Sequence, residues 1–216
     1  MTTQLYDYIR NPEEIYRRSF AAIRAEVDLS HLPPDLEAVA VRLIHACGMP
    51  DIVQDLAFSS AAATRGRRAL ASGAPILVDT EMVAHGIIQS RLPLANQVLC
   101  TLNGDAVRER ARAGATTRSA AAVELWLPYL EGAVVAIGNA PTALFRLLEL
   151  FDEGAPRPAV VLAFPVGFVG AAESKDALAN HPAKVPFVTV RGRRGGSAMA
   201  AAAVNALAGP ETGARR

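Results

Sequence analysis

The segment Val160–Lys175, VVLAFPVGFVGAAESK, constrains the fold of this chain more than any other stretch. Its first five residues form an unbroken apolar run, which is typical of a strand buried on both faces of a parallel sheet. A proline ends this run, two glycines bracket a loop, and a helix is expected over Ala171–Leu178. The first N–H groups of a helix have no partners within it, so they can face an anion. The segment therefore predicts a strand–loop–helix unit with an anion-facing turn.

The same alternation recurs along the chain. Five apolar stretches are expected as strands, and helical stretches separate them: Pro75–Val78, Asn96–Leu102, Ala133–Ile137, Val160–Phe164 and Phe187–Val190. The pattern predicts an α/β fold with a mainly parallel sheet of five strands or slightly more, and with helices on both faces. A chain of 216 residues with 51% apolar content can bury one large core. We therefore expect a single domain over residues 1–216, with its core at about 6–207 and a polar tail at 209–216.

Three helices are expected before the first strand, and the second carries a candidate proton donor. This helix opens at Pro34 and ends near Gly48, which can adopt a left-handed C-cap conformation. His45 lies in its last turn, where the helix dipole favours the imidazolium by up to about 2 kcal/mol when the ring is partly buried. A proton donor and a histidine that caps the last carbonyls both remain possible from this position. Ser19 lies beside the apolar stripe of the first helix, where a serine commonly only fills space.

Three strand exits share a glycine, a polar side chain and a helix N-terminus: 138–142 (GNAPT), the loop that begins at Pro165, and 191–197 (RGRRGGS). Ligands of open α/β sheets lie beyond the carboxyl ends of the strands, so these loops are expected to converge on one large anionic ligand. The third loop is the strongest candidate for anion binding, through its N–H groups at 195–197 and at least one arginine. Of its arginines, Arg191 is expected to point at the ligand.

Two further charged residues stand at helix starts. Arg118 places a positive charge at the start of a helix, where the helix dipole is also positive. A bound anion would explain its presence there. Asp79 follows the first expected strand, and its simplest interpretation is an N-cap.

Several classes of protein are disfavoured. A net charge of +1 argues against a nucleic-acid binder that relies on a global basic field. No G-x-G-x-x-G is present, and Ser174-Lys175-Asp176 lacks the glycine that a P-loop needs before its lysine. Two cysteines make no disulfide framework, which fits a reduced cytoplasm. No secretory signal or membrane-spanning stretch is recognised, so a cytoplasmic protein that binds no membrane is expected.

Five long segments, in this order, resemble the precorrin-8X methylmutase family of cobalamin biosynthesis: HACGMPDI (45–52), VDTEMVAHGI (78–87), VAIGNAPTALFRLLEL (135–150), PAVVLAFPVGFVGAAESKDAL (158–178) and VPFVTVRGRRGGSAMAAAAVNAL (185–207). The N-terminal YDYIRNPEEIYRRSFAAIRAE (6–26) is similar as well. The resemblance runs from about Tyr6 to Leu207. Its departures are confined to connecting segments and the polar tail.

The resemblance implies an isomerase that moves a methyl group from C-11 to C-12 on ring C of precorrin-8X, giving hydrogenobyrinic acid. It also implies a homodimer with the active site near the subunit boundary, and no metal or other cofactor. His45 matches the acid/base position of the family, and such a group typically contributes about 10²–10⁴ in rate. Ser19 and Arg118 match positions that the family presents to its substrate. A hand-over of product to the next enzyme of the corrin pathway is a further expected partnership.

The loops and the resemblance together give one set of expected substrate contacts. These are Ser19, Arg118, Asn139, Thr142, Gly167, Phe168, Ser174, Lys175, Arg191, Gly195, Gly196 and Ser197. A macrocycle edged with acetates and propionates is the kind of large polyanion that such loops suit.

Three alternatives stay open at this point. The first is the cobalt-precorrin-8 methylmutase of the anaerobic pathway, and whole-chain similarity favours the metal-free branch over it. The second is a tetrapyrrole carrier, which would keep the arginine and glycine loops without needing His45. The third is a nucleotide-dependent enzyme, which the absent motifs disfavour.

Overall fold

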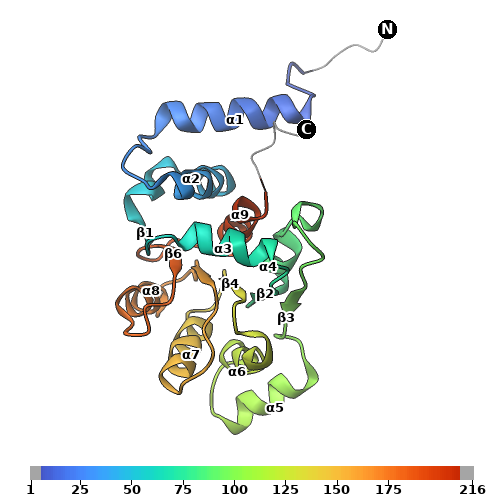
Figure 1. The fold of residues 1–216 in the computed structure, drawn as a ribbon, viewed down its shortest axis with the longest axis vertical. Coiled ribbons are helices and arrows are strands. Elements are labelled where there is room, and N and C mark those ends of the chain that lie inside the picture. Colours follow the sequence, from blue (N-terminus) through green and yellow to red (C-terminus); the bar gives the residue numbers. More distant parts are fainter. Residues whose placement is uncertain (1–5, 210–216) are drawn as a thin grey trace.

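The computed structural model of this chain describes residues 6–209. Its elements are α1 (Pro12–Glu26), α2 (Pro34–Cys47), η1 (Pro50–Asp55), β1 (Leu56–Phe58), α3 (Ala62–Ala71), β2 (Ile76–Val78), α4 (Glu81–Gly86), η2 (Gln89–Arg91), β3 (Val98–Cys100), α5 (Asp105–Ala113), α6 (Arg118–Glu124), η3 (Leu127–Tyr129), β4 (Val134–Ile137), α7 (Pro141–Asp152), β5 (Val160–Ala163), α8 (Ala171–Asn180), β6 (Phe187–Val190) and α9 (Ser197–Leu207) (Figure 1). Of the predicted polar tail, residues 210–216 lie outside the described part.

The strands form one six-stranded sheet in the order β1-β6-β5-β4-β2-β3. The five strands from β2 to β6 are parallel, which confirms the predicted α/β class. The sixth strand, β1, was not predicted; it pairs antiparallel with β6, with Leu56 opposite Val190. It is only three residues long, and its pairing partner lies far along the chain, so no local pattern reveals it.

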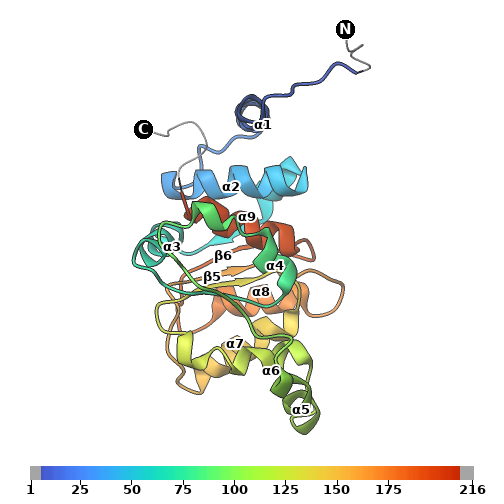
Figure 2. The same ribbon diagram turned by 90° about the vertical axis from the view of Figure 1, so that its right-hand side faces the viewer.

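Residues on the central strands alternate between two cores, one on each face of the sheet. Val134 and Ala136 of β4 belong to the core under α2, α3, α4 and α9, whereas Val135 and Ile137 belong to the core under α6, α7 and α8. Figure 2 shows these layers, with α2 and α9 on one side of the sheet and α7 on the other. Burial on both faces explains why these strands are continuous apolar runs.

Helix α9 lies between α2 and the sheet, and its alanines let its neighbours approach closely. Ala200, Ala201 and Ala203 are buried. A Cβ atom on Gly86 of α4 would lie 2.6 Å from Cβ of Ala201, so this crossing requires small residues on both helices. The alanine-rich stretch is therefore a packing element of the core.

Helix α1 forms an outer layer beyond α2, while α5 and α6 lie at the opposite end of the longest axis (Figures 1 and 2). Asn11 caps α1, because its side chain accepts a hydrogen bond from the N–H of Glu14 (3.0 Å). Only Phe20 and Ile23 of α1 are buried. Over residues 6–209, no helix is both long and apolar enough to cross a membrane.

Candidate active site

The carboxyl ends of the strands lie at one edge of the sheet, and main-chain hydrogen bonds join the three predicted loops there. The N–H of Val166 donates to the carbonyl of Asn139 (3.3 Å), and the N–H of Gly167 donates to the carbonyl of Arg193 (3.2 Å). The Ser197 hydroxyl lies 3.4 Å from the Thr80 hydroxyl, after β2. The loops after β2, β4, β5 and β6 are therefore contiguous. This arrangement was predicted, because ligands of open α/β sheets lie beyond the carboxyl ends of the strands.

Asp79 sits where β2 and β4 lie side by side, and it is 3% exposed. Its carboxylate accepts hydrogen bonds from the N–H groups of Gly138 (2.8 Å), Asn139 (2.9 Å) and Ala140 (2.9 Å). Burial raises the pKa of Asp79, and these three hydrogen bonds act in the opposite direction. The predicted N-cap role of Asp79 was wrong, because Thr80 caps α4. Asp79 instead occupies the N–H groups before α7, so a ligand anion would not find them free.

The three arginines after β6 point to different partners. Arg194 bonds to Asp51 and Asp55, at 2.5 Å in each case. Arg191 lies 3.3 Å from Asp176 of α8. Arg193 stacks near the exposed ring of Phe168, with 5.4 Å from its guanidinium carbon to the ring centre.

The sequence predicted that these three arginines have different roles, and their different partners agree with that. It also predicted that Arg191 faces the ligand. The structure favours Arg193, since within residues 6–209 it is the arginine of this loop that has no carboxylate within ion-pair distance.

Ser174 and Lys175 were expected to touch the substrate, and both are buried instead, at 0% and 1% exposure. The Ser174 hydroxyl donates to the carbonyl of Ala171 in its own helix (3.1 Å). The Lys175 ammonium donates to the carbonyls of Gly192 (2.9 Å) and Arg194 (2.5 Å). Their positions correct that expectation, because neither side chain reaches the surface of this structure. Lys175 instead supports the β6 exit loop from its buried side.

The glycines of this loop also differ from expectation. A Cβ atom on Gly195 would lie 2.4 Å from the carbonyl oxygen of Phe164, so close backbone packing alone requires a glycine there. The N–H of Gly196 donates to that same carbonyl (2.8 Å) and is therefore engaged within the protein. Gly196 itself has a φ of +127°, which favours glycine. The expected use of the Gly196 N–H by the ligand was wrong.

His45 lies at the exposed end of α2, which Gly48 closes in the left-handed conformation as predicted. The Ser19 hydroxyl of α1 lies 2.9 Å from Nδ1 of His45. The rings of Phe20 and Tyr16 lie 5.2 Å and 5.7 Å from the imidazole. Because Nδ1 faces Ser19 of another helix, that nitrogen does not cap the carbonyls of α2.

Partial burial lowers the pKa of His45, and the nearby Arg42 guanidinium lowers it further. Both effects oppose the preference for the imidazolium that the helix terminus was expected to give. The free protein therefore holds His45 as a neutral imidazole near pH 7.

The end of α2 is connected to the β6 exit loop through η1. Gly48 leads directly into η1, and Asp51 and Asp55 of η1 are the carboxylates that bind Arg194. The N–H of Arg191 also donates to the carbonyl of Asp55 (2.8 Å). These contacts hold η1, which follows the end of α2, against the loop that carries the arginines.

Arg118 lies apart from this group. Its guanidinium donates to the carbonyl of Leu102 (3.1 Å) and to the side-chain oxygen of Asn103 (2.9 Å). These oxygens offset the unfavourable position of a cation at a helix start. The neighbouring Thr117 hydroxyl bonds to Thr142 (2.8 Å). Arg118 opens α6, whereas Ser19 lies on α1, and these helices are at opposite ends of the molecule (Figure 1).

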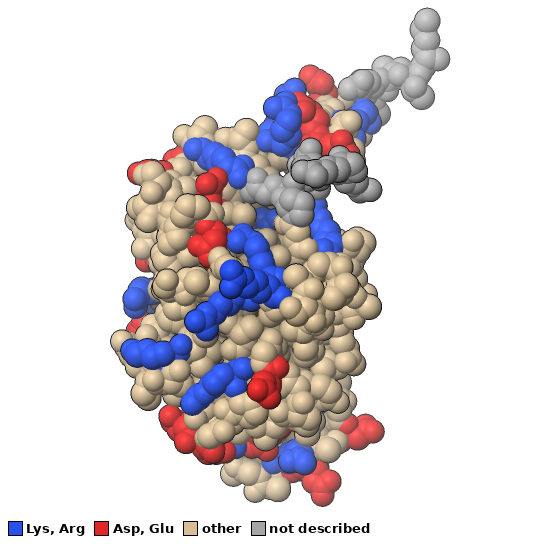
Figure 3. Space-filling view, in the orientation of Figure 1, with Lys and Arg blue, Asp and Glu red and all other residues tan. Residues whose placement is uncertain are grey.

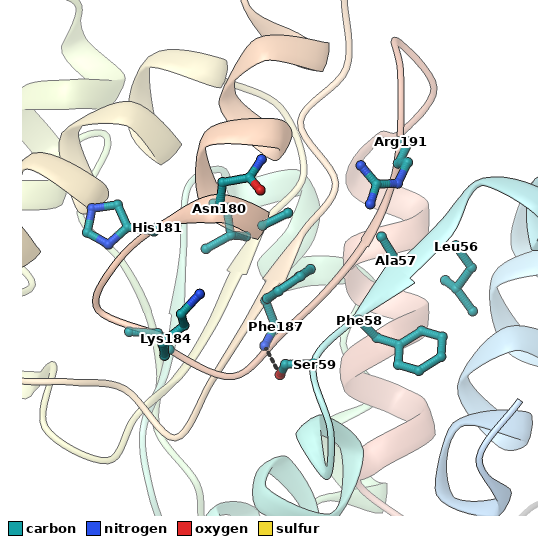
Figure 4. Close-up of a pocket in the computed structure, with 12 residues that line it drawn as sticks. Leu56, Ala57, Phe58, Ser59, Asn180, His181, Lys184, Phe187 and Arg191 are labelled. Carbon is teal, nitrogen blue, oxygen red and sulfur yellow. Dashed lines mark hydrogen bonds between the residues drawn. The ribbon is translucent and has the colours of Figure 1, made fainter.

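A separate cavity of about 520 Å³ lies between β1 and α8. In Figure 4, Arg191 and Lys184 extend toward it from two sides, and the Ser59 hydroxyl accepts a hydrogen bond from the N–H of Phe187 (3.0 Å). Arg191 is the expected site residue that lines it. Figure 3 shows basic side chains gathered over α3, a helix that carries none of the expected site residues.

Sequence reasoning missed Asp79 as the residue that joins two strand exits, although an aspartate directly after a buried strand was its visible signal. It also missed the exposed apolar side chains of the edge, which are Met82 (73%), Val166 (41%) and Val169 (88%), beside the predicted Phe168 (84%). Val166, Phe168 and Val169 lie in one loop, so this edge carries exposed apolar side chains beside its polar groups.

A six-stranded α/β sheet with four contiguous strand exits, and a serine-bound histidine at the end of α2, defines an enzyme-like ligand-binding α/β protein. The family model for precorrin-8X methylmutase matches residues 14–209. The precorrin-8X methylmutase of Pseudomonas aeruginosa is 63% identical over 204 residues, covering 94% of this chain and 98% of that protein. The chain belongs to the precorrin-8X methylmutase family.

Two other relatives define the breadth of this similarity. A cobalt-precorrin-8 methylmutase from Methanothermobacter thermautotrophicus is 37% identical over 206 residues, covering 95% of this chain and 93% of that protein. A solved structure of a precorrin-8X methylmutase from Thermus thermophilus matches with a TM-score of 0.82 and 41% identity, covering 90% of this chain and 94% of that one.

Proposed function

We propose that this protein is a precorrin-8X methylmutase of the aerobic cobalamin pathway, an isomerase that moves a methyl group from C-11 to C-12 and forms hydrogenobyrinic acid. The observation that carries the proposal is the serine-bound His45 in a chain 63% identical to a precorrin-8X methylmutase along almost its whole length. The metal-free substrate is preferred because cobalt-precorrin-8 methylmutases are less similar, at 37% identity for the one from Methanothermobacter thermautotrophicus.

His45 transfers the proton that accompanies the methyl shift. In the free protein its imidazole is neutral, since burial and Arg42 lower its pKa. A substrate edged with carboxylates brings negative charge close to the ring, and nearby negative charge favours the imidazolium. His45 therefore gains its proton as the substrate binds and donates it to the macrocycle. Because substrate and product are isomers, the macrocycle returns one proton to the imidazole as the product forms, and the reaction consumes no net proton. Ser19 holds the ring through Nδ1, so Nε2 is the nitrogen that exchanges the proton.

The remaining acceleration comes from positioning, because an intramolecular shift needs the macrocycle held in one conformation. Arg193 and Phe168 supply a cation and an apolar face at the carboxyl edge, and Asn139 supplies an exposed amide. Gly167 gives the β5 loop its extended turn, with a φ of +144°. Ser197 presents the start of α9 to this edge.

We also propose that the active unit is a homodimer whose sites are shared between subunits. Ser19 and Arg118 are both expected at the substrate, but their helices lie at opposite ends of the folded subunit (Figure 1). The exposed Val166, Phe168 and Val169 offer apolar area for a second subunit or for the ligand. Product hand-over to the next enzyme would fit a cytoplasmic pathway protein.

The test is the ultraviolet–visible spectrum after mixing the protein with metal-free precorrin-8X. Conversion to the hydrogenobyrinic acid chromophore is expected. A spectrum that shifts on binding without conversion would identify a carrier, and conversion only of the cobalt-containing substrate would place the protein in the other branch. Turnover that depends on an added nucleotide would contradict the proposal.

A further inference from the structure

Lys175 is one of only two lysines in the chain, and it is almost completely buried, at 1% exposure. It lies in α8, which follows the β5 exit loop, and its ammonium reaches across to the β6 exit loop. There it donates to the carbonyls of Gly192 (2.9 Å) and Arg194 (2.5 Å). The carbonyl between them, that of Arg193, accepts from the N–H of Gly167 (3.2 Å). Three consecutive carbonyls of the β6 loop are thus held from the side of the β5 loop and α8.

This arrangement fixes the direction of the neighbouring N–H groups. In a trans peptide the carbonyl of one residue and the N–H of the next point in opposite directions, and no cis peptide occurs in the described chain. Holding the carbonyls of 192–194 on one side therefore turns the N–H groups of 193–195 to the other side. Within residues 6–209, those three N–H groups donate to no protein acceptor. Lys175 thereby orients the N–H groups of 193 and 195, and the contact of Gly167 orients that of 194.

Stability alone does not explain a lysine at this position. A buried ammonium loses its hydration, and an apolar side chain of similar length commonly gives equal or greater stability at such sites. Burial also lowers the pKa of Lys175 to about 8, and Asp176 acts in the opposite direction. The energetic cost indicates that the charge serves the loop that it holds.

We propose that Lys175 is a positioning residue of the methylmutase reaction: by holding the carbonyls of Gly192 and Arg194 it keeps the β6 exit loop in the conformation that presents Arg193 and the loop N–H groups to a substrate carboxylate. This inference rests on the proposed function, because it needs a polycarboxylate ligand at the carboxyl edge. Lys175 itself does not touch that ligand.

The first test compares Lys175→Met with Lys184→Met, in steady-state assays with precorrin-8X. Methionine keeps the length and the apolar stem of lysine but donates no hydrogen bond. Lys175→Met should raise KM roughly ten- to a hundredfold, as expected for losing a charge-assisted contact with a carboxylate. The kcat should change by less than about threefold, since His45 is untouched. Lys184 is the exposed lysine, and Lys184→Met should leave both constants unchanged.

A KM for Lys175→Met equal to that of the parent would overturn the inference while leaving the proposed function intact. A purely structural role would instead lower the melting temperature and the amount of active protein, with KM unchanged in the folded fraction. Failure of the parent protein itself to bind or convert precorrin-8X would overturn both proposals.

A second test uses the unmodified protein, so it does not depend on the variant folding. The acylation rates of the two lysines by an amine-reactive ester are followed by mass spectrometry. Lys175 should react far more slowly than Lys184, and hydrogenobyrinic acid should slow Lys175 further by closing the loop over it. The rate at Lys184 should not change. If saturating product left the Lys175 rate unchanged, the loop would not be coupled to the ligand and the inference would fail.

Discussion

The hydroxyl of Ser19 lies 2.9 Å from Nδ1 of His45 and joins α1 to the end of α2. We expect His45→Ala to abolish turnover while leaving product affinity and melting temperature close to those of the parent. Ser19→Ala should lower kcat about tenfold or more, because the ring loses the contact that orients it. Single-turnover rates with precorrin-8X measure both effects. Turnover by His45→Ala near the parent rate would assign the proton transfer to another group.

Alanine substitutions of the three arginines after β6 should differ in their effect on product binding, and the partner of each side chain predicts the order. Arg193→Ala is expected to weaken hydrogenobyrinic acid binding roughly ten- to a hundredfold, because a charge-assisted pair with a carboxylate is worth about 1.5–3 kcal/mol. Arg191→Ala should have little effect, since that side chain pairs with Asp176. Arg194→Ala should mainly lower stability through the loss of Asp51 and Asp55.

Product titrations at fixed ionic strength measure this order, and melting temperatures provide the folding control. An Arg191→Ala effect larger than that of Arg193→Ala would reverse the assignment and restore the expectation from the sequence.

Gly195→Ala and Gly192→Ala form a matched pair within one loop. The added Cβ at 195 would lie 2.4 Å from the carbonyl oxygen of Phe164, so the loop must move. At 192 nothing lies within 4 Å, and the cost there is the φ of +76° alone, about 1–2 kcal/mol. Gly195→Ala should therefore be the more destabilising variant and should also lose product affinity. Urea denaturation gives both free energies of unfolding, and equal losses would contradict the close packing.

The pH dependence of Lys175 should act in opposite directions on stability and on binding. Its pKa is about 8 in the folded protein, against an ordinary value of 10.5. Between these values the unfolded chain keeps a proton that the folded chain has lost, so this residue makes the free energy of unfolding rise with pH. Product affinity should fall over the same range, because the loop loses its charged donor.

Asp176, the next residue of α8, is the charged side chain that acts on Lys175, while the Arg191 and Arg194 guanidinium groups of the loop pair with Asp176, Asp51 and Asp55. The parent is compared with Lys175→Met from about pH 7 to about pH 10, since contributions shared by both proteins, such as the cysteine thiols, cancel in the difference. Parent affinity that stays flat over this range, at a measured Lys175 pKa near 8, would contradict the prediction.

The shared-site proposal predicts complementation between inactive variants. His45→Ala and Arg118→Ala homodimers should each be inactive or nearly so. Random reassociation should form heterodimers with one intact site, giving up to about a quarter of the parent activity. Sedimentation of the parent should show a dimer at assay concentration. A fully active monomer, or a mixture that gains no activity, would show that each chain builds its own site.

Several features of this protein could be predicted from sequence alone because their causes are local. Continuous apolar runs such as Val160–Ala163 predict buried parallel strands, and the five parallel strands lie within the predicted stretches. Asn11 and Gly48 mark helix boundaries through their own capping chemistry. The convergence of the loops followed from topology, because the carboxyl ends of parallel strands must share an edge.

Only the tertiary structure decided what each polar residue at that edge does. Asp79 and Lys175 look equally available in sequence, yet each is buried and holds backbone groups of another strand exit. The sequence gives no indication that Arg194 would meet Asp51 and Asp55, which lie far away along the chain. The physical reason is that a buried polar group must find a partner, and the partners here come from segments distant in sequence. Local pattern places a residue at the edge of the sheet, but long-range hydrogen bonding decides whether it faces the ligand or supports the loop that does.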